Sequence, residues 1–167
     1  MFKPGSLIVY GSTGVCRVED VGPKKIMKNI LKTCYTLTPL YSRETITVPV
    51  DSPVFMREVI SREQAEQLIG RIPEEEPAAV PGDANAAKTC YEQALRSHSC
   101  DDLLRLVRQI YRRTQCARQS RRPPSQTDQR YMKRAEDLLY GELAVALGIS
   151  REEVVPYIAH RLEAAKS

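Results

Sequence analysis

The stretch Pro73-Glu-Glu-Glu-Pro-Ala-Ala-Val-Pro-Gly82 separates two parts of the chain that have different patterns. It contains three prolines, three acids and a glycine, a composition typical of linkers between domains. The residues before it hold short β-rich segments, whereas the residues after it show helical periodicity. The sequence therefore predicts a two-domain α+β protein, with a first domain over residues 1–72, a linker over 73–85 and an all-α second domain over 86–167.

Four short segments of the first fifty residues are rich in the β-branched and apolar residues of strands. Turn residues separate them, first Gly11-Ser-Thr-Gly14 and then Gly22-Pro23. Pro49 cannot donate to a strand ladder, so we expect its strand at an edge or ending there. Short strands at this spacing predict a small, strongly bent sheet or partial barrel. The expected strands cover residues 6–10, 15–20, 34–38 and 45–50.

Serine residues mark the expected starts of several helices. Ser61 and Gln64 form a capping box for a helix that Gly70 closes, and this helix comes before the linker. Beyond the linker, four stretches each have one apolar stripe, which predicts a compact helical bundle. These four helices are expected to begin near Ala86, Ser99, Ser125 and Ser150, with Gly148 just after the third of them.

Most of the positive charge lies in one segment of the second half. Residues 1–77 contain ten Lys and Arg against ten Asp and Glu, so the net charge of +4 belongs to residues 78–167. Arginine binds phosphate through two parallel hydrogen bonds, so a dense run of arginines favours a polyanion such as nucleic acid. An acidic protein surface and a solvated helix face are the alternatives. Residues 105–134 hold one acid, Asp128, and ten basic side chains: Arg105, Arg108, Arg112, Arg113, Arg118, Arg121, Arg122, Arg130, Lys133 and Arg134.

Composition and motifs argue against several functional classes. No apolar run approaches the ~20 residues of a membrane span, and the first residues lack the apolar region of a signal peptide, so we expect a soluble, cytoplasmic protein. The five cysteines include no CxxC pair and the two histidines add no ligand spacing, so we expect thiols and no metal. Gly11-Ser-Thr-Gly14 lacks the lysine of a P-loop and is interpreted as a turn. We expect neither an enzyme nor a cofactor, because no nucleophilic triad can be assigned.

A set of short motifs, in order along nearly the whole chain, carries a family resemblance. The set comprises Phe2-Lys-Pro-Gly-Ser-Leu-Ile-Val-Tyr10 with Gly14-Val15, Thr47-Val-Pro-Val50, Arg57-Glu-Val59, Val107-Arg-Gln-Ile-Tyr-Arg-Arg113, Ser125-Gln-Thr-Asp-Gln-Arg-Tyr-Met132 and Ala135-Glu-Asp-Leu-Leu-Tyr-Gly-Glu-Leu143. No single motif is strongly specific, but their order and spacing resemble those of the CarD/CdnL family of bacterial transcription regulators.

The resemblance implies a function for each domain. The first would be a Tudor-like domain, similar to the RNA polymerase-interacting domain of transcription-repair coupling factors, that docks on the polymerase β subunit. The second would contact promoter DNA, largely without sequence preference, and favour the open complex; a monomer is expected. The candidate polymerase-binding residues are Lys24, Lys25, Thr45, Thr47 and Pro49. The candidate DNA-binding residues are Arg112, Arg113, Arg118, Arg121, Arg122, Arg130, Lys133 and Arg134.

Two departures identify a divergent member. Many members have a tryptophan before the first bundle helix, suited to wedging into a base step, but this chain contains no tryptophan and has small residues near Ala84 to Ala87. Tyr91 is interpreted as a core residue and not as a substitute. Thr47 stands where many members have arginine. An adaptor between proteins, whose arginines bind an acidic partner, is therefore a second hypothesis, and a small hydrolase is a distant third.

Overall fold

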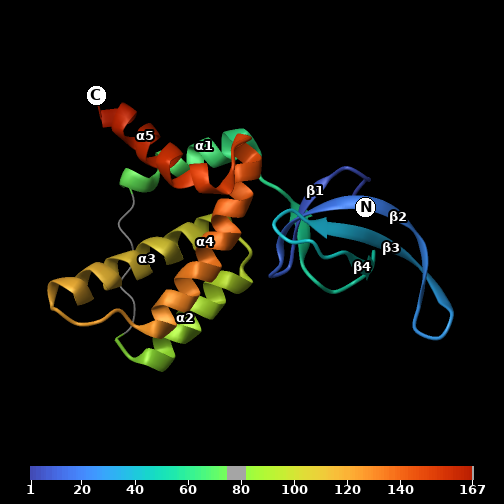
Figure 1. Ribbon diagram of the computed structural model, residues 1–167, viewed down its shortest axis with the longest axis horizontal. Helices are drawn as coiled ribbons and strands as arrows, with labels where there is room; N and C mark the ends of the chain where they lie inside the picture. The colour runs from blue at the N-terminus through green and yellow to red at the C-terminus, as the bar shows by residue number, and fades with distance from the viewer. Residues whose placement is uncertain (75–81, 167) are drawn as a thin grey trace. The chain divides into compact units, whose positions relative to one another are not determined.

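The computed structural model describes residues 1–74 and 82–166. The chain forms two compact units, Met1–Val59 and Ile60–Ser167 (Figure 1). The first unit is built from strands and the second from helices, so the predicted α+β class with a helical C-terminal part is confirmed.

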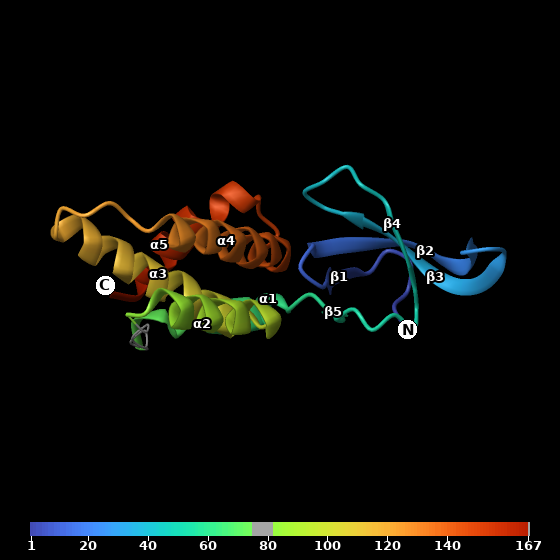
Figure 2. The ribbon, with the colours of Figure 1, turned by 90° about the horizontal axis from the view of Figure 1, so that it is seen from below.

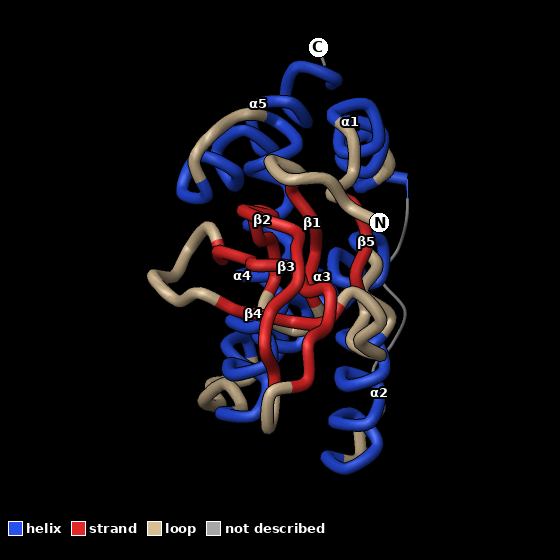
Figure 3. Tube along the Cα trace, turned by 90° about the vertical axis from the view of Figure 1, so that its right-hand side faces the viewer, coloured by secondary structure: helices blue, strands red, loops and turns tan. Residues whose placement is uncertain are grey.

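The sheet of the first unit has five antiparallel strands in the order β4-β3-β2-β1-β5. It stays open, because the two outermost strands, β4 and β5, do not pair with each other. Figure 3 shows the strands in red, with β2 and β3 as the long central pair. The strands are β1 (Leu7–Tyr10), β2 (Gly14–Ile26), β3 (Ile30–Pro39), β4 (Ile46–Pro49) and β5 (Met56–Glu58).

The turn predicted at Gly22-Pro23 is wrong, because β2 continues through both residues to Ile26. Proline is tolerated here for a geometric reason. Thr33, the partner of Pro23, uses its carbonyl to accept the amide of Val50, the residue after β4, so the Pro23–Thr33 pair is not a hydrogen-bonded pair of the β2–β3 ladder. The missing N–H of Pro23 therefore points away from β3 and removes no ladder bond.

A small apolar cluster holds the sheet together. Its buried members come from all strands except β5, and Tyr35 at its edge accepts a hydrogen bond from the backbone amide of Phe2 at 3.1 Å. The Phe2 ring also contacts the Tyr35 ring, with centroids 5.8 Å apart, so the N-terminal residues are fastened to the core. The buried members are Ile8, Cys16, Val18, Tyr35, Leu37 and Val48.

Five α-helices lie in the described part of the second unit, and Figure 2 shows α2, α3 and α4 lying lengthwise beside one another. Short 3₁₀ turns, Ile72–Glu74 and Arg151–Glu153, follow α1 and precede α5. Leu106, Ile110, Leu139 and other apolar side chains form one core between the helices. The helices are α1 (Arg62–Gly70), α2 (Ala84–Arg96), α3 (Cys100–Gln119), α4 (Gln126–Leu147) and α5 (Val154–Lys166).

Several predicted helix ends are confirmed. Ser61 and Gln64 form both bonds of the capping box of α1, and Ser125 accepts the Asp128 amide at the start of α4. Gly148 follows α4 in the left-handed conformation, with φ at +70°, which glycine adopts without a steric penalty. The prediction that Gly70 closes α1 is wrong in detail, because Gly70 is its last residue and Arg71 is the C-cap.

Helix α1 belongs to the helical unit and not to the sheet unit. Its Ala65, Leu68 and Ile69 are buried in the helical core, and Glu66 accepts hydrogen bonds from Tyr157 and Arg161 of α5. The two units therefore divide between residues 59 and 60, earlier than the expected boundary at residue 72. Most of the expected linker, residues 75–81, lies outside the described residues.

Glu142 fixes the first residue of the helical unit. This side chain is only 2% exposed, and its two carboxylate oxygens accept from the Ile60 amide at 3.0 Å and from the Cys100 thiol at 3.1 Å. A buried carboxylate is stable only when hydrogen bonds replace its lost hydration. Glu142 on α4 thus ties the start of the unit to the first residue of α3.

The position of the boundary changes the distribution of charge. Residues 1–59 contain eight Lys and Arg against five Asp and Glu, a net charge of +3. Residues 60–167 contain 17 against 16, a net charge of +1. The division into a balanced segment over residues 1–77 and a basic one over residues 78–167 therefore does not follow the two structural units, because α1 and the residues after it bring acids into the helical unit.

Candidate interaction surfaces

The edge of β4 presents one backbone amide for pairing with another strand. Val50 donates its amide to the Thr33 carbonyl at 3.0 Å, which fixes the alternation of the β3–β4 ladder. The Cys34–Pro49 and Thr36–Thr47 pairs are then the ones without ladder bonds, so the peptide groups of Thr47 and Pro49 point away from β3. Pro49 has no N–H, which leaves Thr47 as the donor within β4. The prediction of an edge strand is confirmed.

The two candidate lysines of β2 lie on opposite faces of the sheet. Lys24 is aligned with Lys32 and Lys25 with Leu31, and successive side chains of a strand point to opposite faces. We call the face of Tyr35, Leu37 and Val48, which form the buried cluster, the core face. We call the opposite face the threonine face, because Thr36 and Thr47 lie on it.

Three of the five predicted polymerase-binding residues fall on one face. By register, Lys24, Thr47 and Pro49 belong to the threonine face, whereas Lys25 belongs to the core face. Lys24 forms an ion pair at 3.9 Å with exposed Asp20, which the same register places on the threonine face. Thr45 is exposed and immediately precedes β4, outside its ladder. The structure therefore brings together Lys24, Thr47 and Pro49 and separates Lys25 from them.

Sequence reasoning missed the turn between β2 and β3. Met27, Ile30 and Leu31 are 85%, 54% and 62% exposed, an unusual group of aliphatic side chains on one turn. The sequence does contain a signal for this group, because the three aliphatic residues lie between Lys24 and Lys32 in a segment without acidic residues. The Gly22-Pro23 pair, which has the composition of a turn, lies a few residues earlier and predicts the turn at the wrong place.

The basic residues of the helical unit do not form one unneutralised surface. Arg113 of α3 donates from Nε to the buried carboxylate of Asp128 on α4 at 3.2 Å, and Tyr91 of α2 donates its hydroxyl to the other oxygen of Asp128 at 2.9 Å. This network joins three helices inside the unit. Burial and the Asp128 carboxylate raise the pKa of Tyr91, so its proton stays in the hydrogen bond. The prediction that Tyr91 is a core residue is confirmed.

Other basic side chains on α3 and α4 also have local partners. Lys133 forms an ion pair with Asp137 at 3.6 Å, and Arg105 one with Asp102 at 2.9 Å. The Arg134 guanidinium lies over the Tyr131 ring, 5.7 Å from its centroid. Arg112 is exposed on α3 and also takes part in an interaction. These contacts reduce the positive field, although exposed pairs are weak and exchange readily.

The remaining candidates lie at the α3–α4 connection. Arg118 is in the last turn of α3, while Arg121 and Arg122 follow that helix, and their amides donate to Arg118 and Ala117 carbonyls. Arg130 is exposed in the second turn of α4. No ion pair within the described residues joins these four arginines to a carboxylate. The structure therefore places the available positive charge near one end of the helical unit.

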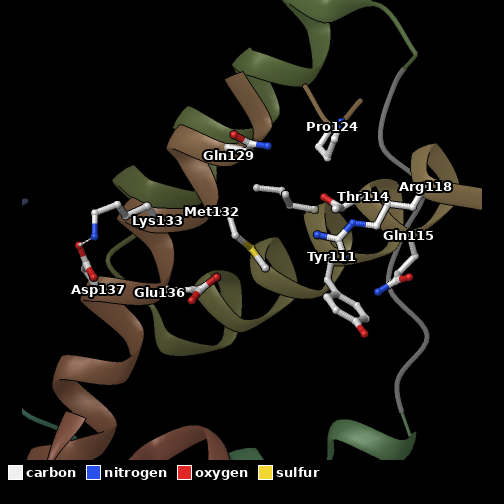
Figure 4. A pocket seen from close by; sticks show the side chains of 11 residues that line it. Tyr111, Thr114, Gln115, Arg118, Pro124, Gln129, Met132, Lys133, Glu136 and Asp137 are labelled. Atoms are coloured by element: carbon white, nitrogen blue, oxygen red, sulfur yellow. Dashed lines mark ion pairs between the residues drawn. The ribbon is translucent and has the colours of Figure 1, made fainter. Parts of the chain in front are cut away.

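A groove between α3 and α4 lies beside this connection (Figure 4). Its volume is about 350 Å³, and Ile110 and Met132 contribute apolar side chains. Arg118 and Lys133 on its lining are matched by Glu136 and Asp137, so the groove has no excess positive charge. Burial and the neighbouring Asp137 raise the pKa of Glu136, and burial raises the pKa of adjacent Tyr140 to about 12. This charge balance argues against the groove as a phosphate site.

The described residues contain neither a membrane-spanning helix nor a group of side chains that could hold a metal ion. None of the helices over residues 1–74 and 82–166 has the length and apolar character to cross a membrane. In the same ranges, no group of three or more His, Cys, Asp or Glu side chains is arranged to hold a metal ion.

The comparison with protein families identifies the sheet unit. Residues 2–60 match the family model of the CarD-like/TRCF RID domain, where RID denotes an RNA polymerase-interacting domain. No curated protein matches the chain. The matched residues coincide with the compact unit Met1–Val59 and stop at the first residue of the helical unit. The predicted family resemblance is confirmed for this part: residues 2–60 match the CarD-like/TRCF RID domain family, a family of RNA polymerase-interacting domains.

Proposed function

We propose that the chain is a transcription regulator that docks on the β subunit of RNA polymerase and contacts promoter DNA, stabilising the open complex. The observation that carries the proposal is the match of residues 2–60 to an RNA polymerase-interacting domain. An open, antiparallel sheet of five strands is compatible with the expected Tudor-like domain. The matched family is one of protein-interaction domains, which supports a polymerase contact as the function of this unit.

Docking would use the edge of β4 and the threonine face. An extended segment of the polymerase can add a strand to a free edge through main-chain hydrogen bonds. Because Pro49 lacks an amide, the Thr47 amide would be the donor from β4, and the carbonyls of Thr47 and Pro49 would accept. Lys24 on the same face would then contact an acidic side chain of the partner.

The DNA contact would centre on the α3–α4 connection. Arg118, Arg121, Arg122 and Arg130 are exposed, and arginine contacts to phosphate provide affinity without sequence preference. Arg112, Arg113, Lys133 and Arg134 would contribute less, because each of them already takes part in another interaction. Docking on the polymerase would raise the local concentration of promoter DNA, so weak binding would suffice.

The second candidate function is a polymerase-bound adaptor without a DNA contact. The observation that favours it is the charge of the helical unit, where 17 basic residues oppose 16 acidic ones. In this case the exposed arginines would bind an acidic protein, and the chain would need no substitute for the tryptophan that it lacks. The two functions share the polymerase contact and differ in the partner of the second unit.

The docking experiment measures binding of the full-length chain to purified RNA polymerase and to the separate β subunit. Thr47→Pro removes the outward amide, whereas the matched control Thr47→Ala shortens the side chain and keeps the amide. We expect Thr47→Pro to weaken binding about tenfold or more, because it removes a hydrogen bond and its ring obstructs pairing of a partner strand with the β4 edge. Thr47→Ala keeps the amide and should change binding less than about threefold. Absence of polymerase binding by the wild-type chain would refute the proposed function.

The DNA experiment measures how the affinity for promoter duplex changes with salt concentration. Each phosphate contact contributes about −0.9 to the slope of log K against log salt. Arg121→Ala combined with Arg122→Ala should therefore make the slope less steep by about 1.8. Undetectable DNA binding by a chain that still binds polymerase would support the adaptor.

A further inference from the structure

The β2–β3 turn and the first residues of β3 carry the densest group of exposed aliphatic side chains in the described residues of the sheet unit. Met27, Ile30 and Leu31 lie within five residues, and each is more than half exposed. Apolar side chains gathered on a projecting element are typical of protein interfaces, because their burial against a partner is favourable. Figure 1 shows β2, β3 and their turn extending away from the other strands of the unit.

The register defines how far the turn projects. The last residue after β4 that bonds to β3 is Val50, which donates to Thr33. Beyond this point, the pairs Lys24–Lys32, Lys25–Leu31 and Ile26–Ile30 belong to a two-stranded ribbon without support from β4. At about 3.3 Å per residue, three pairs extend the ribbon by roughly 10 Å. The ribbon is therefore long enough to place its end against a partner that docks on β4.

Alternation assigns the exposed side chains of the ribbon to its two faces. Ile30 and Lys32 occupy even positions of β3, together with Thr36, and their β2 partners include Lys24. They therefore belong to the threonine face. Leu31 occupies an odd position with Tyr35 and is paired with Lys25, so it belongs to the core face. Neighbouring residues of similar size and exposure thus point to opposite sides.

We propose that Ile30 and Lys32 extend the docking surface of Lys24 and Thr47, and that this surface binds an apolar patch bordered by carboxylates on RNA polymerase. The proposal rests on the proposed function and adds the chemistry of the partner surface. Leu31 and Lys25, on the core face, lie outside this surface. The docking surface then runs along one side of the sheet from the β4 edge to the end of the ribbon.

Charge complementarity identifies the chemistry of the partner. Residues 21–43 contain Lys24, Lys25, Lys28, Lys32 and Arg43 and no acidic residue. Lysine side chains beside an aliphatic one match a surface on which carboxylates surround an apolar pocket. A protein is favoured over DNA as the partner, because residues 2–60 match an RNA polymerase-interacting domain.

The turn itself supports a fixed presentation of these side chains. Met27, Lys28 and Asn29 have φ values of +25°, +50° and +68°, a left-handed run that L-residues rarely adopt. The Ile30 amide donates to the Met27 carbonyl at 3.3 Å and closes this run. The closed turn holds Ile26 and Ile30 as a pair at the end of the ribbon.

The test compares Ile30→Ser with Leu31→Ser in the full-length chain, by measuring affinity for RNA polymerase. Both side chains are more than half exposed, so neither substitution should change the thermal midpoint appreciably. We expect Ile30→Ser to weaken binding about tenfold, because it removes a buried aliphatic contact, and Leu31→Ser to change it less than about twofold. Lys32→Gln and Lys25→Gln form a second pair of variants. Only Lys32→Gln should lower the affinity for polymerase and make that affinity less dependent on salt concentration.

The outcomes separate this inference from the proposed function. If the wild-type chain fails to bind polymerase, the proposed function fails and the inference fails with it. If the wild-type chain binds and Ile30→Ser and Leu31→Ser behave alike, only the inference is overturned. If Ile30→Ser leaves polymerase binding unchanged but weakens binding to promoter duplex or to anionic vesicles, the ribbon contacts that other partner and the inference is also overturned.

Discussion

The predicted binding residues are arranged differently in the sheet unit and in the helical unit. In the sheet unit, the register places Lys24, Thr47 and Pro49 on one face and leaves them at the surface. In the helical unit, residues that are close in sequence diverge, so that Arg113 reaches a buried carboxylate while Arg118 stays exposed at the end of α3. A high local charge in a sequence is therefore a weaker guide to a binding surface on a helical bundle than residue alternation is on a sheet.

The largest effect expected from this comparison is on stability. Glu142→Ala should destabilise the helical unit by about 2–4 kcal/mol, because the Ile60 amide and the Cys100 thiol lose their acceptor and a cavity remains. The measurement is urea unfolding followed by far-ultraviolet circular dichroism. Glu136→Ala, on the lining of the α3–α4 groove, is the control and should cost less than about 1 kcal/mol. Equal losses for the two variants would show that the carboxylate of Glu142 has no special structural role.

The next effect concerns the two faces of the sheet. Lys24→Glu should weaken binding to RNA polymerase about tenfold, because it reverses a charge on the threonine face next to the β4 edge. Lys25→Glu makes the same change in net charge on the core face and should have an effect below about threefold. Surface plasmon resonance with immobilised polymerase measures both. A stronger effect of Lys25→Glu than of Lys24→Glu would place the docking surface on the core face and contradict this prediction.

A smaller effect tests whether ion pairs conceal a DNA-binding surface. Asp128→Asn keeps an acceptor for the Tyr91 hydroxyl but removes the charge that engages Arg113. The released guanidinium should raise the affinity for duplex DNA about threefold, while stability falls by about 1–2 kcal/mol. Fluorescence anisotropy with labelled duplex measures the affinity. Asp101→Asn, which changes the net charge equally and releases Arg71 at the other end of α3, should raise it less. Identical gains would indicate a general charge effect.

The smallest effect concerns pH and the contact between α1 and α5. Burial raises the pKa of Glu66, but hydrogen bonds from Tyr157 and Arg161 and the nearby guanidinium charges outweigh it and hold the pKa below its ordinary value. A carboxyl with a lowered folded-state pKa stabilises the fold above its unfolded pKa, and this stabilisation disappears as the pH falls through the folded value. Glu66→Gln should therefore cost up to about 1 kcal/mol at pH 7, discounted for solvent screening.

Thermal unfolding at pH 7 and pH 3 measures this contribution. The difference between the Glu66→Gln variant and the wild-type chain should shrink at the lower pH, because the wild-type carboxylate is then also neutralised. Glu63→Gln, in the first turn of the same helix, provides the comparison and should show no such convergence. A constant difference at both pH values would mean that Glu66 acts through packing alone.

Local chemistry accounts for the features that were predictable from the sequence. The capping box at Ser61, the cap at Ser125 and the left-handed Gly148 depend on residues within one helical turn, so they are visible in the sequence. The edge position of β4 follows from the missing amide of Pro49. The predicted turn at Gly22-Pro23 failed because the tolerance of a strand for proline depends on which side of the ladder it occupies.

Sequence patterns alone predicted that a strand-rich region precedes a helical one, the family resemblance of the N-terminal unit, and the segment where positive charge is concentrated, but they did not predict β5. These features follow from hydrophobic periodicity and capping, which act over a few residues. Three features required the folded structure: α1 belongs to the helical unit, Asp128 engages Arg113, and Lys24 and Lys25 lie on opposite faces of the sheet. Each of these features depends on strand register or on a contact between helices that are distant in sequence. The free energy of burying apolar side chains selects which strands and helices pack together.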